Sequence, residues 1–136
     1  MTQQTLVLIK PDAVHRNLIG EIVARCERKG YRVVELRKFN PGVELLETHY
    51  AEHHGKPFFG PLVEFMNSGD VVAIRLEGDR VIEGFRSLAG ATDPTHAAPG
   101  TIRGDFGRDW GTKVQQNLVH GSDSPESAER ELSLWF

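Results

Sequence analysis

Residues Asn117-Leu-Val-His-Gly-Ser-Asp-Ser-Pro-Glu126 join an expected strand to an expected helix and carry the most informative pattern in the chain. The apolar run at 117–119 is typical of a short buried strand, and the turn and capping residues after it predict a helix from Pro125. His120 is therefore expected at the end of a strand. A histidine after two apolar residues is also often a packed side chain with both ring nitrogens satisfied, and that interpretation stays open.

Three neighbours favour a functional role for His120. Gly121 would let a ligand approach the backbone closely. Ser124 or Asp123 can cap the following helix, and Glu126 falls in its first turn. A carboxylate from Glu126 on one ring nitrogen would fix the tautomer of His120 and leave the other nitrogen free as a nucleophile.

Length and charge restrict the classes of function. The 136 residues, 39% of them hydrophobic, suit one globular domain spanning residues 1–136. The 16 Lys and Arg against 19 Asp and Glu give a formal charge of −3, so the chain has no bulk attraction to nucleic acid or to an anionic membrane. The sequence contains no targeting segment and no apolar run near the roughly 18 residues of a membrane span, so a cytoplasmic location is expected.

The apolar pattern predicts strands that alternate with helices. Strands are expected at 5–9, 31–39, 71–76 and 117–119, and helices at 14–29, 45–50, 58–66, 79–88 and from 125 onward. Residues 89–105 are rich in Gly and Pro, and a loop of that length suggests a function. The order predicts an α/β (α+β) fold of the ferredoxin-like split βαβ type. Its four-stranded antiparallel sheet would be covered by helices, with a helical hairpin and the long loop added.

Two groups of polar residues could form an anion site. Lys10 directly follows the first expected strand, although a solvated lysine is the ordinary alternative there. Arg86, Thr92 and Arg103 flank or lie in the long loop, and guanidinium groups match phosphate oxygens bidentately. Each is a weak signal alone, because most arginines are simply solvated. If they converge, they would bind a polyphosphate.

Histidines at 49, 53 and 54 raise the question of a metal site. His49 and His53 stand four residues apart, as two ligands on one helix face would. The order His-Tyr-Ala-Glu-His lacks the glutamate placement of a metalloprotease helix, and no third spaced ligand is evident. The sequence therefore predicts no metal held by the protein itself.

The decapeptide around His120 resembles the active-site signature of the nucleoside diphosphate kinases, in which the histidine is transiently phosphorylated. The resemblance runs along nearly the whole chain, through Thr5-Leu-Val-Leu-Ile-Lys-Pro-Asp12, His49-Tyr-Ala-Glu-His53 and Pro99-Gly-Thr-Ile-Arg-Gly-Asp-Phe106. It implies a ping-pong enzyme that moves the γ-phosphate of a nucleoside triphosphate, typically ATP, to a nucleoside diphosphate through phospho-His120.

Two other classes of function agree less well with the sequence. A non-catalytic nucleotide-binding regulatory module would keep the phosphate contacts without needing His120 and Glu126 together, yet both are present. An RNA-binding protein of similar topology would need exposed aromatic residues on central strands and a basic surface. The sequence shows neither feature.

The resemblance also implies a role for each candidate residue. Phe58 would stack on the base with Val114 on the far side, and Asn117 would hold the ribose. The implied catalytic residues are His120, Glu126, Lys10 and Tyr50, and the implied nucleotide-binding residues are Lys10, His53, Phe58, Arg86, Thr92, Arg103, Val114 and Asn117. Magnesium (Mg2+) would enter bound through the nucleotide phosphates. The assembly would be a homo-oligomer, with a hexamer favoured and a tetramer possible.

One segment departs from the family pattern. Ten residues separate Phe106 from Asn117, a longer connection than is usual for these kinases. The extra residues are expected around 107–111, in a turn lifted off the body of the domain. Trp110 would pack at the rim of the base slot or against a neighbouring subunit. A mobile surface loop with Trp110 loosely packed is the equal alternative.

Overall fold

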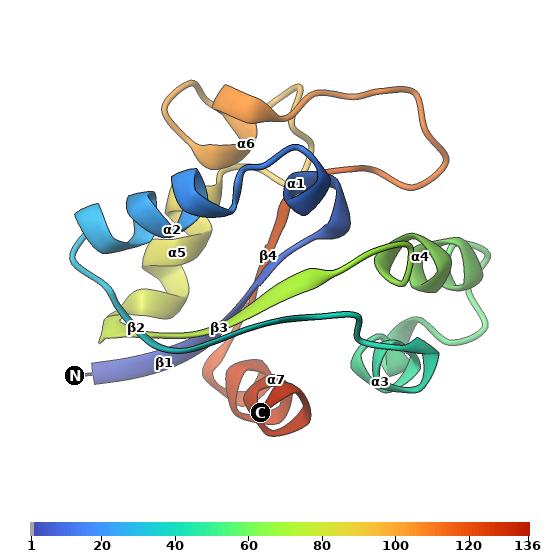
Figure 1. Cartoon of the computed structure of the whole chain (residues 1–136), viewed down its shortest axis with the longest axis horizontal. Coiled ribbons are helices and arrows are strands. Elements are labelled where there is room, and N and C mark those ends of the chain that lie inside the picture. Colours follow the sequence, from blue (N-terminus) through green and yellow to red (C-terminus); the bar gives the residue numbers. More distant parts are fainter. Residues whose placement is uncertain (1) are drawn as a thin grey trace.

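The computed structural model describes residues 2–136. Its centre is one antiparallel sheet of four strands in the order β2-β3-β1-β4 (Figure 1). The strands are β1 (Thr2–Ile9), β2 (Arg32–Phe39), β3 (Val71–Asp79) and β4 (Val119–Gly121). The predicted α+β fold with a four-stranded antiparallel sheet is confirmed.

Strand β1 lies inside the sheet and positions the end of the chain that carries His120. It pairs with β3 along its whole length and with β4 at three residues, where Leu8 lies opposite His120. The four residues before Lys10 have no solvent exposure, as expected for a continuously apolar strand covered on both faces. His120 is thus attached to a fully buried stretch of backbone.

The helices lie on both faces of the sheet and at one end of it (Figure 1). Helices α2 (Ile19–Arg28) and α5 (Val81–Ala89) cover one face, and α7 (Pro125–Trp135) covers the other. Helices α3 (Val43–His49) and α4 (Phe59–Met66), with the short 3-10 helix η1 (Ala51–His53) between them, form the predicted helical hairpin at one end. The short helices α1 (Pro11–His15) and α6 (Ile102–Phe106) complete the chain.

Side chains that alternate along β1 divide the core into two layers. Val7 and Ile9 pack in one cluster with residues of α2 and α5. Leu6 and Leu8 pack in the other, with residues of the hairpin and of α7. This alternation follows from the two-residue period of a strand.

Several boundaries differ from the prediction. The strand expected at 117–119 is found at Val119–Gly121, so His120 is its middle residue and not its end. The helix expected at 14–29 is interrupted because Asn17 has a positive φ of 61°, which ends α1 before α2 begins. The helix expected at 79–88 begins at Val81, since Arg80 takes a left-handed φ of 55° after β3. The loop expected at 89–105 contains the first part of α6, where the Thr101 hydroxyl accepts the N–H of Gly104 at 3.0 Å.

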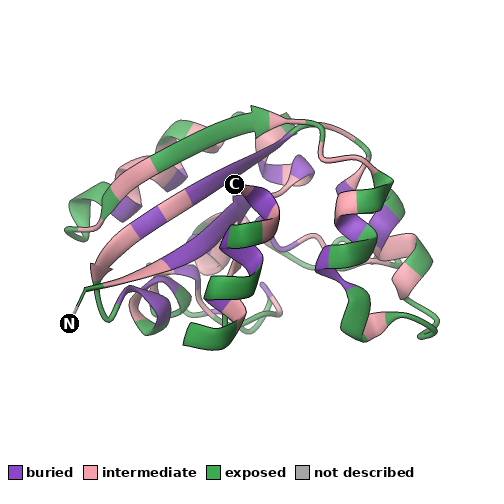
Figure 2. Cartoon of the chain, turned by 90° about the horizontal axis from the view of Figure 1, so that it is seen from below, coloured by how far each residue is buried: buried purple, intermediate pink, exposed green. Residues whose placement is uncertain are grey.

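The strands of the sheet differ in exposure. Strands β1 and β3 are largely buried, whereas β2 is an exposed edge strand (Figure 2). Leu36 on β2 is 46% exposed. Within residues 2–136, no helix combines the length and the apolar character that crossing a bilayer requires.

Candidate active site

His120 lines a cavity of about 240 Å³ that is bordered by residues of the hairpin, α5, β4 and α7. The predicted site residues that also line this cavity are Lys10, Tyr50, His53, Arg86, Thr92, Arg103 and Asn117. The fold therefore brings together residues that the sequence spreads over more than 100 positions. A larger groove of about 660 Å³ between β1, β3 and α7 is lined by residues such as Gln4, Arg75 and Phe136 and contains no histidine or cysteine.

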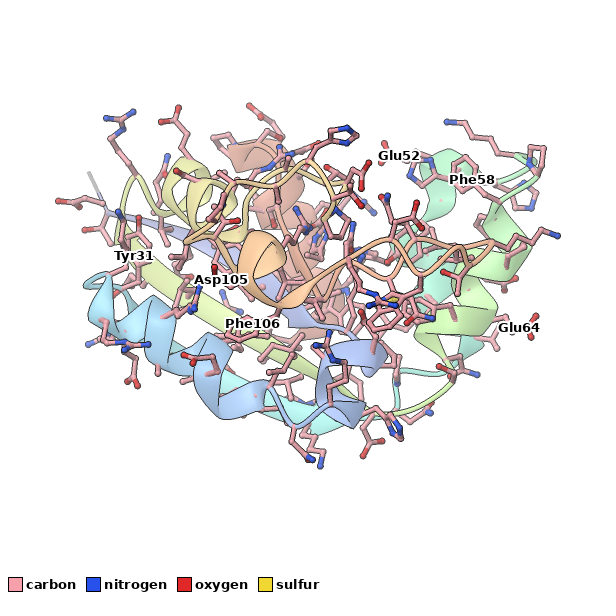
Figure 3. The ribbon with its side chains drawn as sticks, turned by 90° about the horizontal axis from the view of Figure 1, so that it is seen from above. Tyr31, Glu52, Phe58, Glu64, Asp105 and Phe106 are labelled. Atoms are coloured by element: carbon pink, nitrogen blue, oxygen red, sulfur yellow. The ribbon has the colours of Figure 1, made fainter. Side chains whose placement is uncertain are left out.

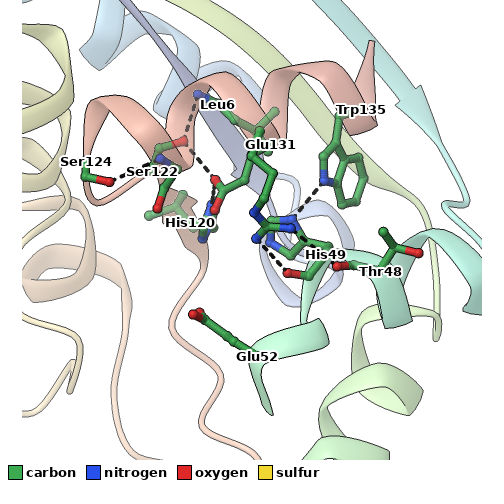
Figure 4. Close-up of polar contacts among 12 residues, drawn as sticks. Leu6, Thr48, His49, Glu52, His120, Ser122, Ser124, Glu131 and Trp135 are labelled. Atoms are coloured by element: carbon green, nitrogen blue, oxygen red, sulfur yellow. Dashed lines mark hydrogen bonds and ion pairs between the residues drawn. The ribbon is translucent and has the colours of Figure 1, made fainter. Parts of the chain in front are cut away.

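A carboxylate holds the imidazole of His120. Its Nε2 lies 2.7 Å from Oε1 of Glu131, which also accepts a hydrogen bond from the Ser122 hydroxyl at 2.8 Å (Figure 4). Burial alone would raise the pKa of the Glu131 carboxyl, but its hydrogen bond with His120, the charge of that ring and the hydrogen bond from Ser122 hold the pKa below its usual value. Glu131 is thus an ionised acceptor. Nε2 of His120 carries the proton, and Nδ1 keeps its lone pair.

The expectation that Glu126 orients the imidazole is wrong. Glu126 is exposed in the first turn of α7, and Glu131 supplies the carboxylate instead. The reason is the geometry of the helix, whose buried face carries Ala128, Glu131, Leu132 and Trp135 at spacings of three and four residues. The apolar periodicity of α7 could have located Glu131, because a carboxylate on a buried face requires a partner.

Ser122 connects the carboxylate of Glu131 to the sheet. Its buried hydroxyl accepts the N–H of Leu6 at 3.2 Å and donates to Glu131, so both functions of the hydroxyl are used (Figure 4). The neighbouring Gly121 was expected to give a ligand access to the backbone. Instead, a Cβ atom there would lie 2.6 Å from Cδ2 of Phe85, so this glycine allows α5 to pack closely on β4.

The backbone just before His120 is strained. Leu118 has a φ of 73°, a left-handed conformation that costs a non-glycine residue about 1–2 kcal/mol. Two hydrogen bonds hold it there: its N–H donates to Oδ2 of Asp12 at 3.1 Å, and its carbonyl accepts the N–H of Lys10 at 2.8 Å. Burial raises the pKa of Asp12, although the nearby charge of Lys10 opposes this. These two hydrogen bonds connect the residues that follow β1 to the backbone just before β4.

Lys10 is a partly buried cation at the predicted position. Its Nζ donates to Oδ1 of Asn117 at 2.8 Å, and Nδ2 of Asn117 donates to the carbonyl of Thr92 at 3.1 Å. Burial, together with the charge of Arg103, lowers the pKa of Lys10 to about 8. A cation held in this way is stabilised when an anion binds beside it.

Arg103 joins the long loop to β4. Its guanidinium donates to the carbonyls of Gly90 at 2.9 Å, Asn117 at 2.9 Å and Val119 at 2.6 Å. Burial, and then the charge of Arg86, lowers the pKa of Arg103 to about 10. An arginine has five N–H groups, so after these three hydrogen bonds two remain for a ligand.

The aromatic rings around His120 include one that was not predicted. The ring of His49 stands nearly perpendicular to that of His120, with centroids 5.0 Å apart. Tyr50, predicted beside the histidine, lines the cavity and contacts His49 at 4.6 Å. His49 had been considered only as a metal ligand, and only its adjacency to Tyr50 in the sequence hinted at this position.

The residues predicted to hold the base do not line the cavity. Phe58 is 44% exposed on the hairpin, with its ring centroid 5.1 Å from that of His53 (Figure 3). Val114 lies in the segment after the extra residues, where its carbonyl accepts the Thr112 hydroxyl. The cavity itself is lined by the phosphate-binding candidates and the histidine.

Comparison with known proteins shows the family of this chain. A model of the nucleoside diphosphate kinase family matches residues 3–136. The chain belongs to the nucleoside diphosphate kinase family. It is 61% identical over 137 residues to the nucleoside diphosphate kinase of Nocardia farcinica, covering 100% of this chain and 96% of the relative. It is 63% identical over 139 residues to that of Streptomyces griseus, covering 100% and 97%.

Solved structures of nucleoside diphosphate kinases have the same fold. The enzyme of Halobacterium salinarum in complex with CDP has a TM-score of 0.94 and 47% identity, covering 100% of this chain and 88% of that one. A nucleoside diphosphate kinase family protein from Babesia bovis has a TM-score of 0.92 and 42% identity, covering 98% and 88%. The predicted family, fold, function and enzyme class are confirmed.

A metal held by the side chains of this nucleoside diphosphate kinase does not fit the site. Among the described residues, His49, His120 and Glu131 bring ligand atoms within 4.8 Å of one another. Nδ1 of His49 accepts the indole N–H of Trp135 at 3.0 Å, and Nε2 of His120 is paired with Glu131. Magnesium prefers a set of oxygen ligands, and this cluster offers one carboxylate.

Proposed function

We propose that His120 carries the phosphoryl group in a ping-pong exchange between nucleotides, within one domain of residues 1–136. The observation that supports this is the pairing of His120 Nε2 with Glu131 at 2.7 Å. Because that pairing occupies one ring nitrogen, Nδ1 is the nitrogen with a lone pair for attack. His120 also lines a cavity with three basic side chains, as a site for a polyanion requires.

The first half-reaction is an in-line displacement at the γ-phosphorus. Nδ1 of His120 forms the N–P bond while the bond from phosphorus to the bridging oxygen breaks, and that electron pair leaves on the β-phosphate of the diphosphate product. The ring becomes an imidazolium, since Nε2 keeps its proton. Glu131 stabilises this positive charge, so the carboxylate lowers the barrier as well as orienting the ring.

The second half-reaction uses the same residues in reverse. A new nucleoside diphosphate binds, its β-phosphate oxygen attacks the phosphorus, and His120 leaves with its lone pair restored. Lys10, Arg86 and Arg103 would stabilise the negative charge on the transferring group in both directions. With one site for both halves, the enzyme would alternate between its free form and the form phosphorylated on His120.

The nucleoside would extend out of the cavity toward the hairpin. A volume of about 240 Å³ suits the phosphates better than a whole nucleotide, since pockets that enclose drug-sized ligands are usually about 300–1,000 Å³. Phe58 would stack on the base at the mouth, with Val114 on the other side, and Asn117 and Thr92 would bind the ribose and inner phosphates. The complex of the Halobacterium salinarum relative with CDP supports a nucleotide ligand.

Magnesium would enter as part of the substrate. The cavity holds cations that match phosphate oxygens, and its buried carboxylate is already engaged by His120 and Ser122. When bound to the nucleotide, the ion would supply positive charge on the phosphates. This leaves Lys10, Arg86 and Arg103 to hold the phosphates that the ion does not neutralise.

We also propose a homo-oligomer, with a hexamer favoured over a tetramer, in the cytoplasm. Strand β2 is a long exposed edge, and an unpaired edge is a ready site for association. Light scattering in the micromolar range should give a mass several times that of one chain. A monomer at all these concentrations would contradict the assembly without affecting the chemistry.

Labelling with γ-phosphate-labelled ATP tests the function directly. The protein should take up one acid-labile, alkali-stable label and release it on addition of a nucleoside diphosphate. In His120→Ala both steps should be lost by several orders of magnitude, because the nucleophile makes the bond that defines each half-reaction. A wild-type protein that binds nucleotide but takes up no label would instead be a non-catalytic nucleotide-binding module.

A further inference from the structure

His49 is a buried titratable group that the phosphoryl transfer does not use. It ends α3 and is 3% exposed. Its ring is enclosed by His120 at 5.0 Å, Tyr50 at 4.6 Å and Trp135 at 5.5 Å, each within about 12° of perpendicular. Edge-to-face contacts of this kind fix the orientation of both rings. The ring of His49 thus packs directly against the ring of His120.

The hydrogen bond from Trp135 decides the tautomer of His49. The indole Nε1–H donates to Nδ1 of His49 at 3.0 Å (Figure 4). An indole nitrogen is a donor only, so Nδ1 must be the unprotonated acceptor and the proton lies on Nε2. A proton on Nδ1 would place two N–H groups against each other in a buried site. The bond from Trp135 therefore opposes the cationic form of His49.

Residues of helix α7 hold both His120 and His49 in position. It carries Glu131, which holds His120, and Trp135, which holds His49, one turn apart. Between hairpin and helix, Arg130 donates to the carbonyls of His49 at 3.2 Å and Thr48 at 3.4 Å (Figure 4). The position of His49 relative to Glu131 is thus set by three hydrogen bonds from one helix.

We propose that the hydrogen bond from Trp135 keeps His49 a neutral positioning residue, which holds the ring of His120 and leaves the carboxylate of Glu131 to His120 alone. This rests on the proposed role of His120 as phosphoryl carrier. If His49 were cationic, it would attract the same carboxylate, because a nitrogen of His49 lies within 4.8 Å of Glu131. His120 would then lose part of its orientation and of the charge that stabilises its imidazolium.

The charges around His49 agree with a neutral ring. The groups that face it are His120 on β4, Glu131 and Arg130 on α7, Lys10 at the end of β1, and the neighbouring Tyr50. Burial, then His120, lowers the pKa of His49 to about 3, against the opposing effect of Glu131. Trp135 adds what these charges do not, a hydrogen bond that requires the neutral form.

Trp135→Phe tests the proposal, because it keeps an aromatic ring and removes the N–H. Nitrogen NMR of the full-length protein should show His49 as the Nε2–H tautomer in the wild type at all pH values from about 5 to 8, and partly protonated in the variant at the acid end. Single-turnover phosphorylation of His120 by ATP should stay within about threefold of wild type near pH 8. Near pH 5.5 it should fall by about tenfold more than in the wild type.

Two further variants separate this from simple packing. Phe39→Leu alters the contact on Trp135, where the ring centroids are 5.9 Å apart, but leaves the N–H in place, so it should keep the wild-type pH profile. His49→Gln can accept the indole N–H and cannot be protonated, so it should also keep that profile, even if Trp135→Phe fails to fold. A profile for His49→Gln that steepens in acid would overturn the proposal, as would an equal loss at every pH in Trp135→Phe.

The readouts also distinguish the two proposals. A wild-type protein with no label on His120 would refute the proposed function. The NMR tautomer of His49 would still show whether Trp135 holds the ring neutral. An Nδ1–H tautomer in the wild type would refute this inference while leaving the labelling result intact.

Discussion

Two groups of residues around the cavity satisfy their polar atoms in opposite ways. The bonded group, His49, Ser122, Glu131 and Trp135, contains two hydrogen-bonded pairs: Ser122 donates to Glu131 at 2.8 Å and Trp135 donates to His49 at 3.0 Å. Glu131 pairs with His120 at 2.7 Å, and the ring of His49 packs against that of His120. The cationic group is Lys10, Arg86 and Arg103, where burial, and then the charge of a neighbouring guanidinium, lowers the pKa of Lys10 and of Arg103. In the proposed reaction, the ring of His120 would therefore be oriented before any substrate binds. The bound phosphates would then balance the positive charge of the cationic group.

The largest expected effect concerns the acid stability of the bonded group. The pKa of His49 is lowered to about 3 from an ordinary 6.5. Below pH 6.5 the unfolded chain therefore binds a proton that the folded chain does not, so the folded state loses stability as pH falls through this window. The loss should approach about 1.4 kcal/mol per pH unit below pH 6.5, or roughly 2 kcal/mol between pH 6.5 and 4.5.

Urea unfolding at several pH values across that window checks this prediction. His49→Gln should flatten the dependence by about one proton, because it removes the group that titrates. His15→Gln is the matched control, since His15 is exposed on α1 and its replacement should leave the slope as it is. Equal slopes for the wild type and His49→Gln would mean that His49 is not held neutral by the fold.

The next effect separates the two glutamates of α7. Glu131→Gln should slow phosphorylation of His120 about 10- to 100-fold, as loss of a supporting carboxylate typically does, because the amide cannot neutralise the imidazolium. Glu126→Gln should stay within about twofold of wild type, since that side chain is exposed in the first helical turn. Rapid-quench measurement of the labelled enzyme compares both. A slower Glu126 variant than Glu131 variant would reverse the assignment.

These two glutamates also show how far sequence reasoning reaches. The strands expected at 5–9 and 71–76 are present, each three residues longer than predicted, because continuous apolar runs admit few other structures. Glu126 was preferred over Glu131 because it is nearer to His120 in sequence, whereas the helical period places Glu131 on the buried face. Proximity in sequence is a poor guide across a strand–helix turn.

Other features depend on contacts between distant segments. His49 lies 71 positions before His120, and only the docking of the hairpin on α7 brings the two rings together. The break at Asn17 depends on a left-handed backbone that an amphipathic pattern does not reveal. The candidate cations all line the cavity: Lys10 directly follows β1, whose end was recognisable, whereas Arg86 and Arg103 lie within α5 and α6 on either side of the Gly- and Pro-rich connection.

A smaller effect should appear in the cationic group as pH rises. The pKa of Lys10 is lowered to about 8, so the free enzyme loses this charge above that pH. Affinity for a nucleoside diphosphate should then fall, by up to about tenfold between pH 7 and pH 9. Lys10→Arg keeps the charge throughout and should remove most of this dependence, even if binding is weaker overall. Calorimetric titration at each pH measures this affinity. If the affinity of Lys10→Arg kept the same pH dependence, a group other than Lys10 would cause that dependence.

The smallest expected effect concerns the extra residues after Phe106. Trp110 is 45% exposed, with the Arg108 guanidinium 3.8 Å from its ring centroid and that of Arg16 at 5.9 Å. With Asp12, His15, Arg16 and Gln116 it lines a small pocket, and it does not line the cavity of His120. Exposed cation–π contacts contribute about 0.5–1 kcal/mol to stability. The segment should therefore have little effect on the position of the bonded group or of the cationic group.

Deleting residues 108–111 should therefore leave the label on His120 in place. Nucleotide affinity, stability and assembly should change by no more than about 1–2 kcal/mol, on the scale of one aromatic contact. Trp110→Ala is the milder control and should give part of the same change. If the deletion removed the label from a protein that stayed folded and assembled, the segment would belong to the catalytic apparatus. The site would then need a third group of residues beside the bonded and the cationic ones.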